Sequence, residues 1–173
     1  PSSVRDENAP DIQLDSYKGS LPILGVCYGA QLMAHKQGGH VTPSKIREYG
    51  RANLTQIIPC ALTTNLTSGS QVWMSHGDTI TNTPEHFECI ISTKDVAYAG
   101  YKIKGEETYG IQFHPEVYHS TEGTILLKNF VYTICGCKGE WTPNSFIEET
   151  ITQLQNQLQN DKVVLGLSGG VDR

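Results

Sequence analysis

A short apolar run early in the chain passes directly into a stretch with helical character. Residues 21–26, Leu-Pro-Ile-Leu-Gly-Val, are almost wholly apolar, as is typical of a strand buried on both faces of a parallel sheet. Residues 29–37 have helical character, and Gly38 and Gly39 then provide a helix stop. The pattern predicts a strand followed at once by a helix, which is a building block of α/β folds.

After this helix the pattern becomes β-rich and then helical again. Turns of Gly, Asn, Pro and Ser separate five short segments with β character: residues 52–58, 71–74, 87–92, 97–103 and 108–113. A helix is expected over residues 122–134, because five apolar residues recur there at helical spacing: Ile125, Leu126, Phe130, Val131 and Ile134. We therefore expect an α/β fold with an open, mostly parallel sheet flanked by helices.

The C-terminal part of the chain has a different pattern. Thr142 and Pro143 are typical of an N-cap followed by proline in the first helical turn. They predict an amphipathic helix with the apolar stripe Ile147, Ile151, Leu154 and Leu158. A fresh buried-type strand is expected over residues 162–167. The predicted organisation is one domain over residues 1–136, a linker with the amphipathic helix over 137–160, and the start of a second domain over 161–173.

Charge and composition exclude several classes of partner. The formal net charge is −5, and the chain contains no Lys/Arg run, so binding to nucleic acid has no electrostatic support. No apolar run is long enough to span a bilayer, and no signal segment opens the chain. The odd number of cysteines, five, argues against a closed disulfide framework and for a reducing compartment. We expect a soluble, cytoplasmic chain without nucleic-acid or membrane partners.

The most reactive candidate side chain is Cys27, in the sequence Gly25-Val26-Cys27-Tyr28-Gly29 between the predicted strand and helix. A nucleophile on a sharp strand-to-helix turn has a strained backbone, and flanking glycines keep Cβ atoms from colliding with the turn. The helix N-terminus favours the thiolate, and the backbone N–H of Tyr28 is placed to donate to an oxyanion. A buried structural cysteine in an ordinary glycine-containing turn is the alternative.

A second motif supplies what a cysteine nucleophile needs. His114 ends an apolar β-type run, and catalytic groups gather at the carboxyl ends of strands in α/β sheets. Glu116 follows two residues later, where its carboxylate can bond the far imidazole nitrogen and stabilise the imidazolium. A lone histidine here would more often be structural. Together with Cys27, the pair predicts acyl transfer, in which the thiolate attacks a carboxamide, ammonia leaves and water cleaves the thioester.

No metal site is expected. Cys135 and Cys137 are separated by a single residue and lack a second pair, and the other histidines lack metal-ligand spacing. Surface or packing roles are expected for them.

Two segments together resemble the class I, triad-type glutamine amidotransferases, whose fold is flavodoxin-like. They are residues 25–31, Gly-Val-Cys-Tyr-Gly-Ala-Gln, and residues 112–116, Gln-Phe-His-Pro-Glu. Further segments resemble the GMP synthases within that family: residues 47–50, 72–78, 141–143 and 168–172. The pairing of an amidotransferase domain with the terminal Ser-Gly-Gly-Val-Asp is specific, because few enzymes join those two parts in that order.

The resemblance implies further site residues. Gln31 is implied as a ligand of the substrate glutamine, and Ser75, Gly77 and Asp78 as the segment that holds its α-amino and carboxylate groups. Residues 1–4 resemble the tail of a glycine-rich oxyanion loop. The terminal loop resembles the pyrophosphate loop of an ATP pyrophosphatase domain, with a plain glycine turn as the alternative: Ser168, Gly169, Gly170, Val171 and Asp172. Arg173 stands where the family pattern has serine.

The implied activity is glutamine hydrolysis without a cofactor, which supplies ammonia for the amination of XMP to GMP in purine biosynthesis. That second step would need ATP and Mg²⁺ in a synthetase domain. A homodimer formed through the C-terminal region is also expected. Because the first strands of the amidotransferase domain and most of the synthetase domain are absent, we expect a fragment that is inactive by itself.

Three alternatives remain at this point. The chain could feed ammonia to a different synthetase, as other class I amidotransferases do. It could be a stand-alone γ-glutamyl hydrolase with the same triad, or an inactive regulatory or interaction module.

Overall fold

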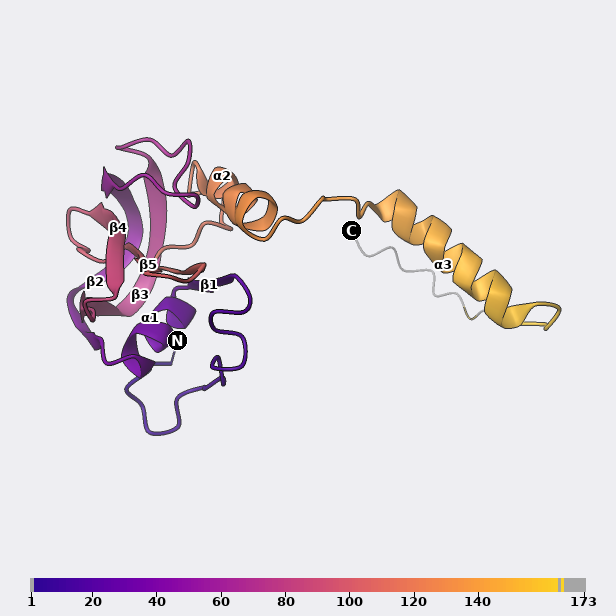
Figure 1. Cartoon of the computed structure of the whole chain (residues 1–173), viewed down its shortest axis with the longest axis horizontal. Coiled ribbons are helices and arrows are strands. Elements are labelled where there is room, and N and C mark those ends of the chain that lie inside the picture. The colour runs from indigo at the N-terminus through magenta and orange to yellow at the C-terminus, as the bar shows by residue number, and fades with distance from the viewer. Residues whose placement is uncertain (1, 165, 167–173) are drawn as a thin grey trace. The chain divides into compact units, whose positions relative to one another are not determined.

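The structure, a computed structural model, describes residues 2–164 and 166, and for residues 45–48 it describes the backbone. The chain divides into two compact units, Pro1–Cys137 and Lys138–Arg173. The first unit contains the sheet and the second contains one long helix, so each is described by itself (Figure 1).

The first unit is built on a six-stranded sheet with the strand order β1-β6-β5-β4-β2-β3. Its strands are β1 (Ile23–Val26), β2 (His40–Ile57), β3 (Gln71–Asn82), β4 (Phe87–Thr93), β5 (Gly100–Ile103) and β6 (Thr108–Ile111). Its helices are α1 (Tyr28–Lys36), α2 (Gly123–Lys128) and the π-helix η1 (Asn129–Ile134). The α/β class is confirmed, and the predicted strand-to-helix step is present as β1 followed by α1.

The sheet is mixed rather than mostly parallel, which corrects the prediction. β1 pairs with β6 in parallel, whereas β2 with β3, β2 with β4, β4 with β5, and β5 with β6 pair antiparallel. Parallel neighbours need a long crossover, usually through a helix. Among the described residues, α1 is the one helix that lies between strands in the chain order, and the later strands follow one another through turns.

Strands β2 and β3 are much longer than the sequence pattern predicts. They pair with each other over most of their length, with a register shift between Pro43 and Glu48. Along β3, burial alternates with period two, as expected for a strand with one covered face. Two of the buried positions carry His76 and Asp78, so the apolar alternation breaks at the point where the strand enters the site.

Two clusters of buried side chains form the core. One lies between the sheet and α1 and includes Met33, Tyr101 and Ile103. The other includes Phe113 and Leu126 and extends to Phe130 and Ile134 of η1. Figure 1 shows α1 and α2 at well-separated places around the strands. The helix predicted over residues 122–134 is therefore present, but its second half is wound as a π-helix.

The second unit contains the amphipathic helix α3 (Pro143–Leu158). Its predicted cap is confirmed, because the Ser145 N–H donates to Thr142 Oγ1 at 3.0 Å and the Thr142 N–H donates to Ser145 Oγ at 2.9 Å. The strand predicted over residues 162–167 is absent from its described residues, 162–164 and 166. Val163 is 63% exposed and Val164 fully exposed, whereas a buried-type strand needs neighbours on both sides.

Candidate active site

Cys27 lies in the turn between β1 and α1, with a strained backbone. Its φ of 51° and ψ of −105° are unusual for a residue with a side chain. The turn is held from both sides, since the Cys27 N–H donates to the Ile111 carbonyl at 2.8 Å and the Gln31 N–H donates to the Cys27 carbonyl at 3.1 Å. The predicted strand-to-helix turn at Cys27 is therefore present.

The two glycines around Cys27 differ in their steric need. A Cβ atom at Gly25 would lie 2.4 Å from Met33 Cε and 2.8 Å from the Ala30 nitrogen, so this position requires glycine. At Gly29 a Cβ atom would meet nothing within 4 Å. The prediction that both neighbours must be glycine is therefore wrong for Gly29, because that residue already lies in the first turn of α1 with its Cβ direction in open space.

The sheet brings the predicted base to the same edge as Cys27. Because β1 and β6 are parallel, with Val26 beside Ile111, the residues that follow both strands meet at one end of the sheet. His114 is partly buried there, and its Nδ1 lies 2.6 Å from Glu116 Oε1. The predicted contact between His114 and Glu116 is present.

The pKa of the Cys27 thiol is higher than the sequence suggested, so the thiol keeps its proton more readily. Its Sγ lies 3.9 Å from the Ser75 carbonyl oxygen, and no hydrogen bond to His114 is present among the described residues. Burial raises the pKa of Cys27, the Tyr28 N–H opposes this, and the charge of Glu116 raises the pKa further. The helix end thus favours the thiolate as expected, but burial outweighs it in the free site.

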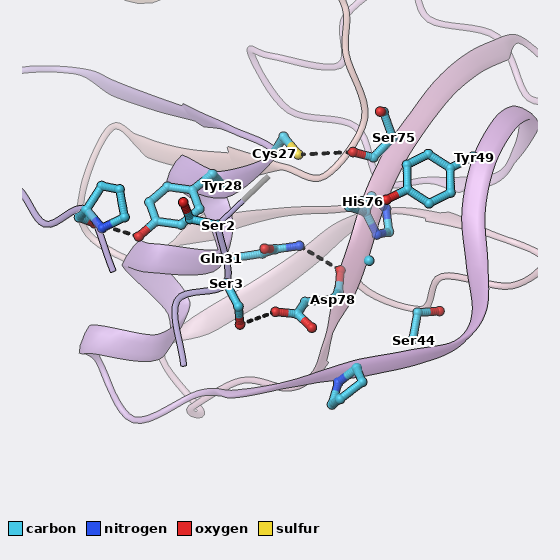
Figure 2. A pocket seen from close by; sticks show the side chains of 13 residues that line it. Ser2, Ser3, Cys27, Tyr28, Gln31, Ser44, Tyr49, Ser75, His76 and Asp78 are labelled. Atoms are coloured by element: carbon cyan, nitrogen blue, oxygen red, sulfur yellow. Dashed lines mark hydrogen bonds between the residues drawn. The ribbon is translucent and has the colours of Figure 1, made fainter. Parts of the chain in front are cut away.

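A cavity of about 610 Å³ opens beside Cys27 (Figure 2). Figure 2 shows the Cys27 sulfur and Ser75 on one side of it and Ser3, Gln31 and Asp78 on the other. Four of the predicted site residues besides Cys27 and Tyr28 line this cavity: Gln31, Ser75, Gly77 and Asp78.

Asp78 presents an ionised carboxylate at the cavity. Ser3 Oγ donates to Asp78 Oδ2, and Arg5 Nη2 donates to Oδ1 at 2.9 Å. Burial by itself would raise the pKa of Asp78, but the hydrogen bonds from Ser3 and Arg5 and the charge of Arg5 hold it below the usual value. The N-terminal segment therefore contributes to the site through Ser3 and Arg5, and sequence reasoning missed Arg5 because it belongs to no recognised motif.

Gln31 has structural partners within the site. Its Nε2 donates to the Asp78 carbonyl at 2.7 Å and to Gln112 Oε1 at 3.3 Å. Gln112 is fully buried, and it also accepts from the Ile80 N–H at 3.2 Å and donates to the Tyr98 carbonyl at 2.8 Å. These two amides join α1, β3 and the end of β6. The sequence contained Gln112 within its motif but assigned it no role.

His76 is buried close to His114 and Asp78, which the sequence did not predict. Burial lowers its pKa, the charge of His114 acts in the same direction, and the backbone and carboxylate of Asp78 oppose the shift. Since the folded pKa lies below the ordinary value of 6.5, the unfolded chain binds a proton first as pH falls. Stability is then complete above that value and declines as pH falls toward the lower folded pKa.

We expect His76→Gln to remove part of this decline. The measurement is the urea midpoint of unfolding between pH 8 and pH 5 for the wild type and the variant. His40→Gln, at an exposed position of β2, serves as the matched control. If wild type and His76→Gln lose stability in parallel over that range, His76 is not the group responsible.

The last group of predicted site residues is the terminal loop. The loop Ser168–Asp172 lies outside the described residues. Within the part of the chain that the structure describes, no group of three or more His, Cys, Asp or Glu side chains is arranged to hold a metal ion. No helix of that part is long and apolar enough to cross a membrane.

Comparison with known proteins supports the interpretation of the motifs. The family described as glutamine amidotransferase class-I matches residues 1–134. The chain is 60% identical to a glutamine-hydrolyzing GMP synthase of Cytophaga hutchinsonii and 56% identical to one of Bacteroides fragilis. Each alignment covers 99% of this chain and 34% of the relative. The chain therefore spans about a third of the length of these relatives.

Solved structures agree on the fold. A protein from Thermoplasma acidophilum described as a GMP synthase subunit has a TM-score of 0.64 and 32% identity, over 75% of this chain and 61% of that one. A glutamine amidotransferase from Thermotoga maritima has a TM-score of 0.52 at 22% identity, over 79% of this chain and 56% of that one. The second likeness concerns the fold alone. The mixed sheet with few helices is thus the fold shared with these amidotransferases.

Proposed function

The chain belongs to the class-I glutamine amidotransferase family, and we propose on this basis that Cys27, His114 and Glu116 hydrolyse glutamine. The observation that carries the proposal is the parallel pairing of β1 with β6. That pairing delivers a strained cysteine and a His–Glu pair to one edge of the sheet. The cavity beside Cys27 has a volume within the range of small-molecule sites.

The three residues have separate roles in the proposed reaction. Cys27 loses its proton to His114 and attacks the side-chain carbonyl of glutamine, so that a tetrahedral intermediate forms. The backbone N–H of Tyr28 donates to the oxyanion of that intermediate. The imidazolium of His114 then protonates the leaving nitrogen, ammonia departs and a thioester with Cys27 remains. Water activated by His114 cleaves the thioester and releases glutamate.

Glu116 orients the base. Its carboxylate contacts Nδ1 of His114, which leaves Nε2 to exchange the proton with the thiol and the leaving group. Because burial raises the pKa of Cys27, the thiol of the free site keeps its proton, and the proposed reaction needs His114 to accept that proton.

Substrate binding is proposed for the wall of the cavity that residues of β3 and Gln31 form. The ionised carboxylate of Asp78 suits the α-ammonium group of glutamine, and Ser75 and Gly77 lie on the same strand. Gln31 supports this wall through its bond to the Asp78 carbonyl. Glutamine hydrolysis itself needs no cofactor in this scheme.

For the longer protein we propose ammonia transfer to ATP-activated XMP, which yields GMP. The support is the identity of 53–60% to GMP synthases over nearly the whole chain, including the linker helix and the segment after it. The synthetase step would require Mg²⁺ and ATP bound outside the described residues. A homodimer through the C-terminal region remains part of this proposal, as does the division into domains at residues 136 and 160.

An isotope-labelling experiment that follows the side-chain amide nitrogen of glutamine tests this proposal. The full-length protein is incubated with glutamine labelled with ¹⁵N at the side-chain amide, together with ATP, Mg²⁺ and XMP. We expect ¹⁵N in the amino group of GMP, detected by mass spectrometry, and no product when ATP is omitted. Release of labelled ammonia with no GMP would indicate a different acceptor. Rapid ATP-independent cleavage of γ-glutamyl peptides would instead indicate a stand-alone hydrolase.

A further inference from the structure

We propose that Ser120 is a positioning residue for the catalytic base, because its hydroxyl fixes the backbone of His114 against strand β3. The inference rests on the proposed glutamine hydrolysis at Cys27. Ser120 does not line the cavity beside Cys27, and its described hydrogen bonds go to the protein backbone. Any effect on the reaction therefore passes through the backbone groups that its hydroxyl contacts, those of His114 and Trp73.

His114 and Trp73 are hydrogen-bonded like two facing residues of an antiparallel strand pair, except that the Ser120 hydroxyl stands between the Trp73 N–H and the His114 carbonyl. The His114 N–H donates to the Trp73 carbonyl at 2.9 Å. The Trp73 N–H donates to Ser120 Oγ at 3.0 Å, and Ser120 Oγ in turn donates to the His114 carbonyl. In a regular antiparallel pair, two facing residues exchange both N–H···O bonds directly. Here the second bond runs through Ser120, so its hydroxyl sets the separation of His114 from β3.

The same strand segment reaches the nucleophile. Ser75 lies two residues after Trp73 on β3, and its carbonyl oxygen accepts the Cys27 thiol at 3.9 Å. The backbone of Trp73 thus connects the position of the base to the position of the sulfur. A shift of His114 away from Trp73 would open the gap across which the proton must pass between Cys27 and His114.

The turn that carries Ser120 is packed closely onto the catalytic segment. The Ser120 N–H donates to the Val117 carbonyl at 3.0 Å, and the Gly123 N–H donates to the Ser120 carbonyl at 3.0 Å. A Cβ atom at Gly123 would lie 2.0 Å from the Pro115 carbonyl oxygen. Ser120 is 5% exposed, so water cannot readily replace its hydroxyl.

The experiment compares Ser120→Ala with Ser120→Thr in the full-length protein. We expect Ser120→Ala to lower kcat of glutamine hydrolysis by about 10- to 100-fold and to change KM for glutamine little, because the cavity wall is untouched. Ser120→Thr keeps a hydroxyl on Cβ and should restore kcat to within a few-fold of wild type. GMP formation driven by added ammonia should stay unchanged in both variants, since it does not use Cys27.

Ser70→Ala provides the matched control. Ser70 Oγ bonds Thr121 Oγ1 at 3.0 Å, so the substitution removes a neighbouring hydroxyl bond that does not involve His114. Its kcat should equal that of wild type. A second readout is the pH dependence of Cys27 alkylation by iodoacetamide, which should shift in Ser120→Ala and not in Ser70→Ala.

Several outcomes would overturn the inference. They are an unchanged kcat in Ser120→Ala, an equal loss in Ser120→Thr, or an equal loss of ammonia-driven synthesis, which would indicate general misfolding. If the wild type itself shows no glutamine hydrolysis, or if Cys27→Ala retains it, the proposed function fails first. That result is distinct from a failure of Ser120 in an active enzyme.

Discussion

Replacing Cys27 by alanine is expected to abolish glutamine hydrolysis, with a loss of at least about 10³-fold in kcat. The loss is large because Cys27 forms the covalent intermediate in the proposed reaction, and Cys27 is the one cysteine among the described residues that line the cavity. Ammonia and glutamate release by the full-length protein measure the effect. GMP formation from added ammonia, XMP and ATP should be retained, since that step bypasses the thiol.

A second cysteine supplies the matched control for this prediction. Cys89 is partly buried on β4, and its thiol donates to the Ala97 carbonyl at 3.1 Å, away from the cavity. Cys89→Ala should hydrolyse glutamine at the wild-type rate. Glutamine hydrolysis that survives Cys27→Ala would rule out Cys27 as the nucleophile, however well the protein folds.

Replacing Gly110 by alanine is expected to cause a large loss of stability. Gly110 faces Tyr101 across β6 and β5, and a Cβ atom there would lie 2.2 Å from Tyr101 Cζ. Moving the Tyr101 ring would cost free energy, because the ring is fully buried and its hydroxyl donates to the Ala30 carbonyl at 2.7 Å. Overpacking of this kind costs about 3 kcal/mol of unfolding free energy, measurable by urea denaturation.

Gly29→Ala tests whether the effect is specific to that position. The same methyl group is added, but in open space within α1, where alanine is the better helix former by about 1 kcal/mol. Stability should be unchanged or slightly higher. If Gly110→Ala unfolds at the wild-type urea concentration, Tyr101 must have an alternative position, and the packing argument for Gly110 would be wrong.

The sequence predicted the local geometry around Cys27, His114 and Glu116 well, because that geometry depends on short segments of the chain. The turn at Cys27 needs a strand before it and a helix after it, and both could be recognised from local pattern. The pair His114 and Glu116 is separated by one residue, so its contact needed no knowledge of the tertiary fold. The structure confirms the local geometry of these residues, and their catalytic roles stay proposals.

Features that depend on distant contacts were not predicted. The sheet direction depends on which strands become neighbours, and turns between β-type segments do not reveal that. The length of β3 was not predicted, because the buried polar residues His76 and Asp78 interrupt its apolar alternation. The roles of Arg5, Gln112 and Ser120 depend on partners far along the chain. The net pKa of Cys27 depends on burial that the helix argument could not include.

The wide spacing of the site residues along the chain has a consequence for folding. Gln31 and Gln112 are separated by 81 positions, and Ser3 and Asp78 by 75. Closing such long loops carries a larger entropy cost than local pairing, and folds rich in distant contacts form slowly. A newly made or partly unfolded chain therefore holds the Cys27 thiol without its base. Under the proposed mechanism, glutamine hydrolysis therefore begins only when the sheet has formed, so that activity at this site would report a folded chain.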